Sequence, residues 1–180
     1  MSGPTHAAFL RAVNLGSTRK APKEKLVECF EGLGHGDVAT FRTSGNVVFS
    51  GSGSASKLTK EIEAGLKRSL GFEVPVFLRT EKQLAAIAAS KPFPPKALAA
   101  SKGKLQVALL LGKPPAAALK RVEEMATDAD RLSLDGTELY WLPEGGTQES
   151  PLDMKAIDNA IGLNTMRTQG TIEQLYGKFF

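Results

Sequence analysis

The chain has 180 residues, of which 42% are hydrophobic and 23% are charged, as in an ordinary folded globular protein. Its length allows one large domain or two small ones. The formal net charge of +4 attracts anions, but it is too small and too dispersed to indicate a nucleic-acid-binding protein. The sequence contains no run of about 18 apolar residues, so no membrane-spanning segment is predicted.

Cysteine and histidine are too rare here to predict a disulfide or a metal centre. Cys29 is the only cysteine, and its place on the apolar face of a predicted helix indicates an inert thiol. His6 lies in the N-terminal tail and His35 lies in a turn between two glycines, and neither has a partner at metal-ligand spacing. The N-terminal residues lack the features of a signal peptide. We therefore expect a cytoplasmic protein without a metal or another cofactor.

The first half predicts strands and helices in the order β-α-β-β-α-β. Apolar runs predict four strands, at 7–13, 38–43, 46–50 and 74–79. Apolar residues at helical spacing predict two helices, from Pro22 to Gly34 and from about Leu58 to Gly71. A further helix is expected from Thr80, where Thr80 and Gln83 form a capping box. A proline-rich stretch, residues 92–104, is predicted to link two domains, 1–91 and 105–180.

The second half repeats this order of elements. Its strands are expected at 105–111, 131–134, 137–142 and 164–168. Asp135-Gly136 is the strongest hairpin signal in the chain. Its helices are expected to begin at Pro114, at Ser150 as the N-cap, and at Thr171. The fold class predicted is α+β, with two tandem ferredoxin-like halves (βαββαβ), antiparallel sheets and extra helices.

Four arginines end predicted strands, and they are the first functional clue: Arg11, Arg42, Arg79 and Arg167. Arginine carries a planar fork that suits carboxylate or phosphate groups. Right-handed crossovers bring the loop after the first strand, Asn14–Gly16, next to the hairpin Ser44–Asn46. The same topology places Arg79 toward the opposite edge of the sheet.

This loop and hairpin form the leading candidate site, for a small anionic ligand that bears phosphate or carboxylate. Backbone N–H groups of a glycine-containing loop and the start of the Pro22 helix both favour negative charge. We expect Arg11 to pair with the anion, and the other members of the site to be Asn14, Gly16, Ser44, Gly45 and Asn46. The spacing of glycine, lysine and hydroxyl residues in the loop does not fit a P-loop.

A structural interpretation of the same residues stays open. Gly45 can serve a tight turn, while Asn14 and Asn46 can bond to the nearby backbone. Arg167, near Thr171 at the start of the last helix, can hold a second anion or can form a salt bridge within the fold.

Two other classes of function remain as alternatives. A single-stranded RNA-binding sheet would stack bases on exposed aromatic residues, for which Phe9 and Phe77 share faces with arginines. The strand 46–50 lacks the basic-glycine-aromatic pattern of such proteins, so nucleic acid is not expected as the main partner. A structural or protein-interaction role has only the proline-rich stretch and the apolar C-terminal end in its favour.

Two segments resemble the bacterial family known as domain of unknown function 1697. They are Phe9–Gly16, which reads Phe-Leu-Arg-Ala-Val-Asn-Leu-Gly, and Thr40–Phe49, which contains Ser-Gly-Asn-Val-Val-Phe. Thr165–Thr171 is similar to the family's closing segment. The resemblance implies a cytoplasmic two-part α+β protein and implies no reaction. Residues that match the family are Arg11, Asn14, Gly16, Ser44, Gly45, Asn46, Arg167 and Thr171, and those that depart are Ala12, Ser17, Arg42, Thr168 and Gln169.

Overall fold

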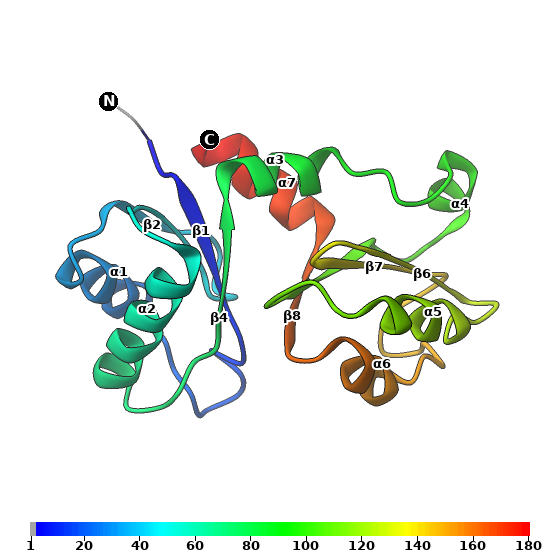
Figure 1. Cartoon of the computed structure of the whole chain (residues 1–180), viewed down its shortest axis with the longest axis horizontal. Coiled ribbons are helices and arrows are strands. Elements are labelled where there is room, and N and C mark those ends of the chain that lie inside the picture. The colour runs from blue at the N-terminus through cyan, green and yellow to red at the C-terminus, as the bar shows by residue number, and fades with distance from the viewer. Residues whose placement is uncertain (1–2) are drawn as a thin grey trace. The chain divides into compact units, whose positions relative to one another are not determined.

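The computed structural model describes residues 3–180 and contains two compact units (Figure 1). The first unit comprises the described residues up to Ala86 together with Gln174–Phe180, and the second comprises Ile87–Glu173. Each unit holds one four-stranded antiparallel sheet. The α+β class and the two ferredoxin-like halves are thereby confirmed.

The first sheet has the order β2-β3-β1-β4, which is that of the ferredoxin-like fold. The elements of this half in chain order are β1 (His6–Leu10), α1 (Lys23–Gly32), β2 (Gly36–Thr40), β3 (Asn46–Ser50), α2 (Ala55–Leu70) and β4 (Val76–Thr80). Helix α3 (Glu81–Ala89) follows β4 directly.

Local chemistry explains where these helices begin and end. Helix α2 starts after Ser54, whose hydroxyl accepts a hydrogen bond from the Lys57 N–H at 3.3 Å. It ends at Gly71, whose φ of 83° lies in the left-handed region. The predicted capping box is present at α3. Thr80 N–H donates to Gln83 Oε1 at 2.9 Å, and Gln83 N–H donates to Thr80 Oγ1 at 3.3 Å.

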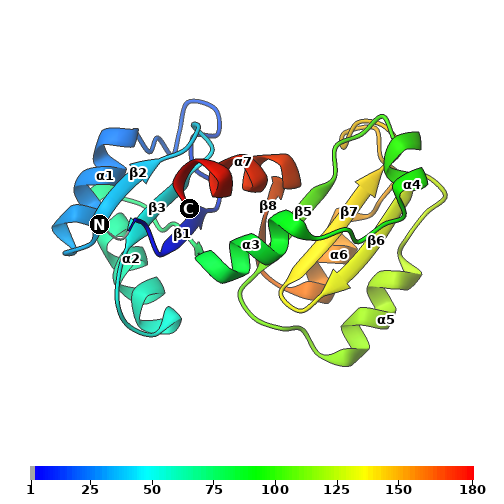
Figure 2. The ribbon, with the colours of Figure 1, turned by 90° about the horizontal axis from the view of Figure 1, so that it is seen from above.

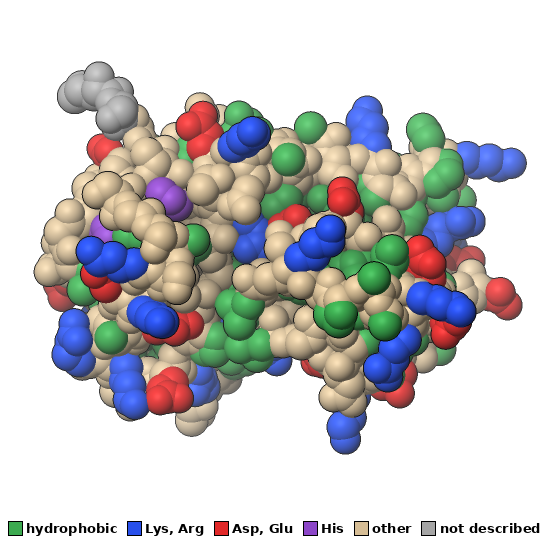
Figure 3. Space-filling model, in the orientation of Figure 1, with side chains coloured by type: hydrophobic (Ala, Val, Ile, Leu, Met, Phe, Trp, Pro, Cys, Tyr) green, Lys and Arg blue, Asp and Glu red, His purple; other side chains and the backbone are tan. Residues whose placement is uncertain are grey.

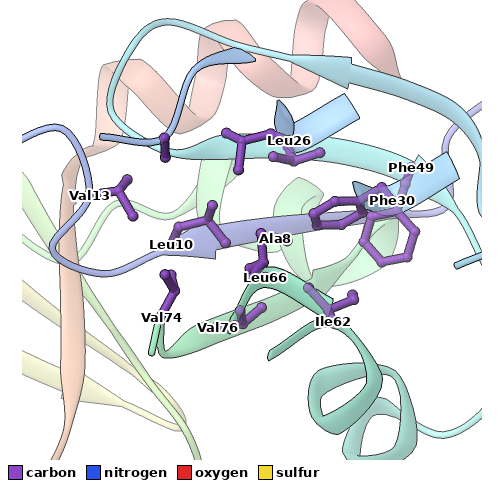
Figure 4. Packing of buried hydrophobic residues seen from close by; sticks show 12 residues of the cluster. Ala8, Leu10, Val13, Leu26, Phe30, Phe49, Ile62, Leu66, Val74 and Val76 are labelled. Carbon is purple, nitrogen blue, oxygen red and sulfur yellow. The ribbon is translucent and has the colours of Figure 1, made fainter. Parts of the chain in front are cut away.

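Both faces of the first sheet are buried. One face packs against α1 and α2 through a cluster that includes Ala8, Leu10, Leu26, Phe30, Phe49, Ile62, Leu66 and Val76 (Figure 4). The opposite face contributes Ala7, Phe9, Val48 and Phe77, each at most 1% exposed. Alternation along each strand therefore supplies apolar side chains to both faces of the central strands, as in a sheet covered on two sides.

The second sheet has the equivalent order, β6-β7-β5-β8. The elements of this half are α4 (Pro95–Ala100), β5 (Gln106–Leu110), α5 (Ala116–Glu124), β6 (Asp130–Asp135), β7 (Glu138–Pro143), α6 (Met154–Ile161), β8 (Asn164–Thr168) and α7 (Gln169–Phe179). Its core joins Leu110, Val122, Trp141 and Ile157 with neighbouring apolar residues. Helix α7 begins in the second unit and ends in the first.

Several local predictions differ from the structure. Strands β1 and β2 end at Leu10 and Thr40, so Arg11 and Arg42 lie in connections and not in strands. The cap of α6 is Asp153, whose carboxylate accepts from the Ala156 N–H at 3.0 Å. Ser150, the expected cap, donates to the Asp130 carboxylate at 2.7 Å instead, because a buried acid needs that partner.

The proline-rich stretch contains regular structure, which the sequence pattern did not indicate. Prolines at 94 and 95 open the short helix α4, and the Ser101 hydroxyl and the Lys102 N–H bond to the carbonyls of Pro143 and Glu144. The domain boundaries 1–91, 92–104 and 105–180 stay a prediction. Among the residues that the structure describes, no helix has both the length and the apolar character that a bilayer crossing requires.

Candidate functional site

The loop after β1 and the β2–β3 hairpin lie side by side, as the topology predicted. The Leu10 N–H donates to the Gly45 carbonyl at 2.8 Å, and the Asn14 side-chain amide donates to the Thr43 carbonyl at 2.8 Å. Two segments about thirty residues apart in the chain thus form one continuous surface.

Asn14 holds this loop in shape. Its amide nitrogen also donates to the Ala21 carbonyl at 3.2 Å, and its carbonyl oxygen accepts from the Ala21 N–H at 2.9 Å. Its backbone is left-handed, with φ of 56°, a conformation that asparagine tolerates better than most residues. Asn14 therefore acts as a hydrogen-bonding centre that joins the two ends of the loop to the hairpin.

Asn46 and Gly45 shape the hairpin in a comparable way. Asn46 is 1% exposed, and its amide donates to the Phe41 carbonyl and to the Ser44 hydroxyl, both at 2.9 Å. Gly45 has φ of 73°, and a Cβ there would lie 2.5 Å from Val13 Cγ2. The contacts of Asn14, Gly45 and Asn46 thereby support the structural interpretation of these residues.

Arg19, which no sequence pattern singles out, binds the same loop from the other side. Its Nε donates to the Ala12 carbonyl and its Nη2 to the Glu73 carbonyl, each at 2.7 Å. Its guanidinium also stands 4.6 Å from the centre of the Phe72 ring. No sequence signal separates Arg19 from the adjacent Lys20, because its partners are backbone carbonyls that only the fold brings near.

Backbone strain is concentrated in these segments. Five described residues other than glycine have positive φ, and four of them lie in the loop or the hairpin: Ala12, Asn14, Arg19 and Arg42. Such conformations persist only where surrounding contacts hold them, and they are frequent at binding sites.

A hollow of about 680 Å³ opens between the loop, the start of α1 and the hairpin. Its polar lining residues include Asn14, Lys20, Lys23, Thr40, Arg42 and Thr43. Three of the lining residues are cationic, and none is Asp or Glu. Lys23 lies 3.7 Å from the Glu24 carboxylate, but both side chains are largely exposed, so this pair neutralises little of the local charge.

The hollow includes only part of the predicted site. Asn14, Gly45 and Asn46 line it, whereas Arg11, Gly16 and Ser44 are not among its lining residues. Arg11 follows β1, and its backbone N–H donates to the Pro75 carbonyl at 3.0 Å. Its role in ligand binding stays a prediction, and so do those of Gly16 and Ser44.

Arg42 lines the hollow, although it departs from the pattern of the family that the sequence resembles. Its Nη2 donates to the Gln174 side-chain carbonyl, and its guanidinium stands 5.4 Å from the centre of the Phe41 ring. The sequence places Lys20 and Lys23 at the start of α1, but their position next to Arg42 depends on the turn between β2 and β3.

Arg167 and Thr171 belong to the second unit and not to this surface. Burial lowers the pKa of Arg167 to about 10, so it remains cationic at neutral pH. Its Nη1 donates to Thr165 Oγ1 at 3.0 Å and to the Met166 carbonyl at 2.8 Å. The Thr171 N–H donates to Thr168 Oγ1 at 3.2 Å, which caps α7. Anion binding by this pair stays a prediction.

Neither Cys29 nor the metal-ligating residue types among the described residues form a further candidate centre. Cys29 is half-buried, and burial raises its pKa, with a smaller opposing effect of Arg68, so its thiol is weakly nucleophilic. Within residues 3–180, no group of three or more His, Cys, Asp or Glu side chains is placed to hold a metal ion.

The RNA alternative meets two obstacles in the structure. Phe9 and Phe77 are at most 1% exposed, and a base cannot stack on a buried ring. Lys and Arg side chains are interspersed with Asp and Glu on the face drawn in Figure 3, without one continuous basic surface.

Comparison with known proteins shows to which family the chain belongs. The family model described as protein of unknown function (DUF1697) matches residues 4–140. The chain belongs to this family. A similar solved structure is that of the conserved bacterial protein SP0830 from Streptococcus pneumoniae, with a TM-score of 0.77, 17% identity and 98% of each chain covered. At this identity the likeness establishes a shared fold and no shared activity. None of the curated proteins matches the chain.

Proposed function

We propose that the first unit of this DUF1697 protein binds a small anionic ligand, bearing phosphate or carboxylate, in the hollow beside the β2–β3 hairpin. The observation that carries the proposal is the lining of the hollow. Lys20, Lys23 and Arg42 converge on it, and no lining residue is acidic. A concave surface with one sign of charge concentrates ligands of the opposite sign.

The start of α1 adds to this attraction. Lys20 and Lys23 stand beside the N-terminal end of a ten-residue helix, where the helix dipole disfavours cations. The residue before the helix is Pro22, which supplies no side-chain cap. A bound anion would offset the repulsion and would accept hydrogen bonds from the first-turn N–H groups.

The remaining lining residues have distinct parts in the proposal. Thr40 and Thr43 supply hydroxyl groups that suit phosphate or carboxylate oxygens. Asn14 and Asn46 keep the walls in place through their backbone hydrogen bonds. Arg11 is a predicted ligand partner that lies outside the lining. Its substitution can therefore be compared with those of the lining residues Lys23 and Arg42.

Calorimetric titration of the full chain with pyrophosphate and with citrate tests the proposal and separates phosphate from carboxylate preference. We expect Lys23→Ala and Arg42→Ala each to weaken binding of the preferred probe by about tenfold, which corresponds to ~1.4 kcal/mol. Lys25→Ala is the matched control, because Lys25 is an exposed lysine of the same helix outside the lining. We expect this control to bind as the wild type does.

Arg11→Ala distinguishes an anion bound in the hollow from an anion bound at Arg11. If Arg11→Ala abolishes binding while Lys23→Ala and Arg42→Ala do not change it, the ligand lies outside the hollow. If neither probe binds the wild-type chain at low ionic strength, or if Lys25→Ala weakens binding as much as Lys23→Ala, the proposal is wrong.

A further inference from the structure

The C-terminal end of α7 is docked on the hairpin that carries Arg42. Residues 174–180 belong to the same compact unit as the hairpin. The Phe41 and Phe179 rings meet edge to face, with centroids 6.1 Å apart and planes at 87°. Lys178 Nζ lies 5.9 Å from the centre of the Phe41 ring. Figure 2 shows the end of α7, in red, beside the end of β2.

Gln174 is the residue of this docked segment that reaches the anion site. Its side-chain carbonyl accepts a hydrogen bond from Arg42 Nη2. Because an amide carries no charge, this contact orients the guanidinium without neutralising it. A carboxylate at the same place would form an ion pair with Arg42 and would cancel its attraction for a ligand.

Arg42 needs such an external contact. It has φ of 59° in the connection after β2, so its backbone adopts a conformation that a non-glycine residue rarely keeps unaided. Arginine also has a long side chain, and holding it in one orientation costs conformational entropy. The neutral acceptor on α7 fixes that orientation before a ligand arrives.

We propose that Gln174 is a positioning residue of the anion site, which holds Arg42 at the wall of the hollow through an uncharged acceptor. This inference rests on the proposed function. It adds a specific role for the C-terminal helix, in which an uncharged side chain orients one of the three cationic side chains of the lining.

The first test is Gln174→Glu in the full chain, titrated with pyrophosphate. The change is nearly isosteric and places a carboxylate beside Arg42, so we expect the dissociation constant to rise about tenfold. Gln148→Glu is the matched control, since it makes the same change at an exposed position of the second unit. We expect it to leave the dissociation constant within about twofold of the wild type.

The second test needs no ligand. Gln174→Met removes the acceptor and keeps the length of the side chain. NMR of the Arg42 guanidinium nitrogens should show restricted rotation in the wild type and faster rotation in Gln174→Met. Unchanged Arg42 signals in this variant, or an unchanged pyrophosphate affinity in Gln174→Glu, would overturn the inference.

The two tests separate failure of this inference from failure of the proposed function. If the wild type binds pyrophosphate but Gln174→Glu binds it equally well, only the positioning role is wrong. If the wild type binds neither pyrophosphate nor citrate while the Arg42 signals still depend on Gln174, the anion site itself is wrong and the contact is structural alone.

Discussion

The two halves of this protein use one scaffold, and they differ in the connection that follows their first strand. Strand β1 pairs with β4 so that Ala7 faces Arg79, and β5 pairs with β8 so that Val107 faces Arg167. The Leu10 N–H donates to the Gly45 carbonyl, and the equivalent Leu110 N–H donates to the Thr137 carbonyl. The repeat therefore extends to individual residues, which comparison of the two sequences did not show.

This equivalence changes the interpretation of two arginines. Arg79 and Arg167 occupy matching strand positions, and each donates through Nη1 to the carbonyl of the preceding residue at 2.8 Å. The threonine that follows each of them caps the next helix. A feature that both halves share belongs to the scaffold, so the distinctive chemistry must lie where the halves differ.

The halves differ in the connection that follows the first strand. Residues 11–22 join β1 to α1, whereas the shorter stretch 111–115 joins β5 to α5. All five non-glycine residues with positive φ among those described lie in the first half. The longer connection, with its strained backbone and its hydrogen bonds through Asn14, forms one wall of the hollow. The difference shows that the candidate site is an addition to the scaffold and not a property of it.

Gly45→Ala is expected to give the largest effect. A Cβ at this position would stand 2.5 Å from Val13 Cγ2 and 3.0 Å from Leu10 Cβ, on a backbone with φ of 73°. We expect a loss of roughly 2–4 kcal/mol in the free energy of unfolding. Thr137 already carries a side chain at the equivalent position, so Thr137→Ala should cost less than about 1 kcal/mol.

Urea unfolding followed by circular dichroism measures both variants, and fluorescence of the single tryptophan, Trp141, reports separately on the second unit. Equal losses for Gly45→Ala and Thr137→Ala would contradict the proposed difference between the two hairpins.

Asn14→Ala is expected to have the next largest effect. It removes two donated hydrogen bonds and one accepted bond that join the loop to Ala21 and Thr43. We expect a loss of roughly 1–3 kcal/mol, measured by the same unfolding experiment. Asn14→Asp keeps the acceptor for the Ala21 N–H and should recover part of the loss. A cost below ~0.5 kcal/mol for Asn14→Ala would show that the loop holds its shape by other means.

Exchanging alanine and glycine after the first strands tests the strain directly. Ala12 has φ of 56°, so Ala12→Gly should stabilise the protein by about 1 kcal/mol. Gly112 stands two residues past the end of β5, outside the left-handed region and with open space for a Cβ. Gly112→Ala should therefore stabilise by about 0.5 kcal/mol. Thermal unfolding measures both shifts, and destabilisation by Ala12→Gly would refute the interpretation of strain.

Acid sensitivity that comes from histidine is the smallest expected difference, because both histidines lie in the first half. Both histidines of the chain contact the Phe49 ring, His6 stacked at 5.4 Å and His35 tilted at 4.7 Å. Burial lowers the pKa of both below 6.5; His35 lowers the pKa of His6 further, and Glu61 partly opposes the effect at His35. His35 Nε2 is buried without a hydrogen-bond partner.

The sign of the pH dependence follows from these shifts. The unfolded chain binds protons at these histidines at higher pH than the folded chain does. Their contribution to stability is therefore present above about pH 6.5 and is lost as the pH falls through the lowered folded pKa values. Melting temperatures measured between about pH 7 and about pH 5.5 should decline less in a His6→Gln, His35→Gln double variant than in the wild type. Parallel declines would assign the effect to other groups.

Local sequence patterns are enough to predict the scaffold. Apolar periodicity, the Thr80–Gln83 capping box and the hairpin signals at Gly45 and Gly136 are local features, and the structure confirms each of them. Local features also sufficed to predict that the loop after β1 lies next to the first hairpin, because crossover handedness limits the topology.

The residues that form the hollow come together only through long-range packing. The positions of Lys20, Lys23 and Arg42 depend on a left-handed loop held by Asn14 and Arg19, and the orientation of Arg42 depends on Gln174. Arg42 and Gln174 are 132 residues apart, and no local pattern couples them. A site made from such contacts has no signature in a single sequence, because its geometry is fixed by chain segments that meet only after folding.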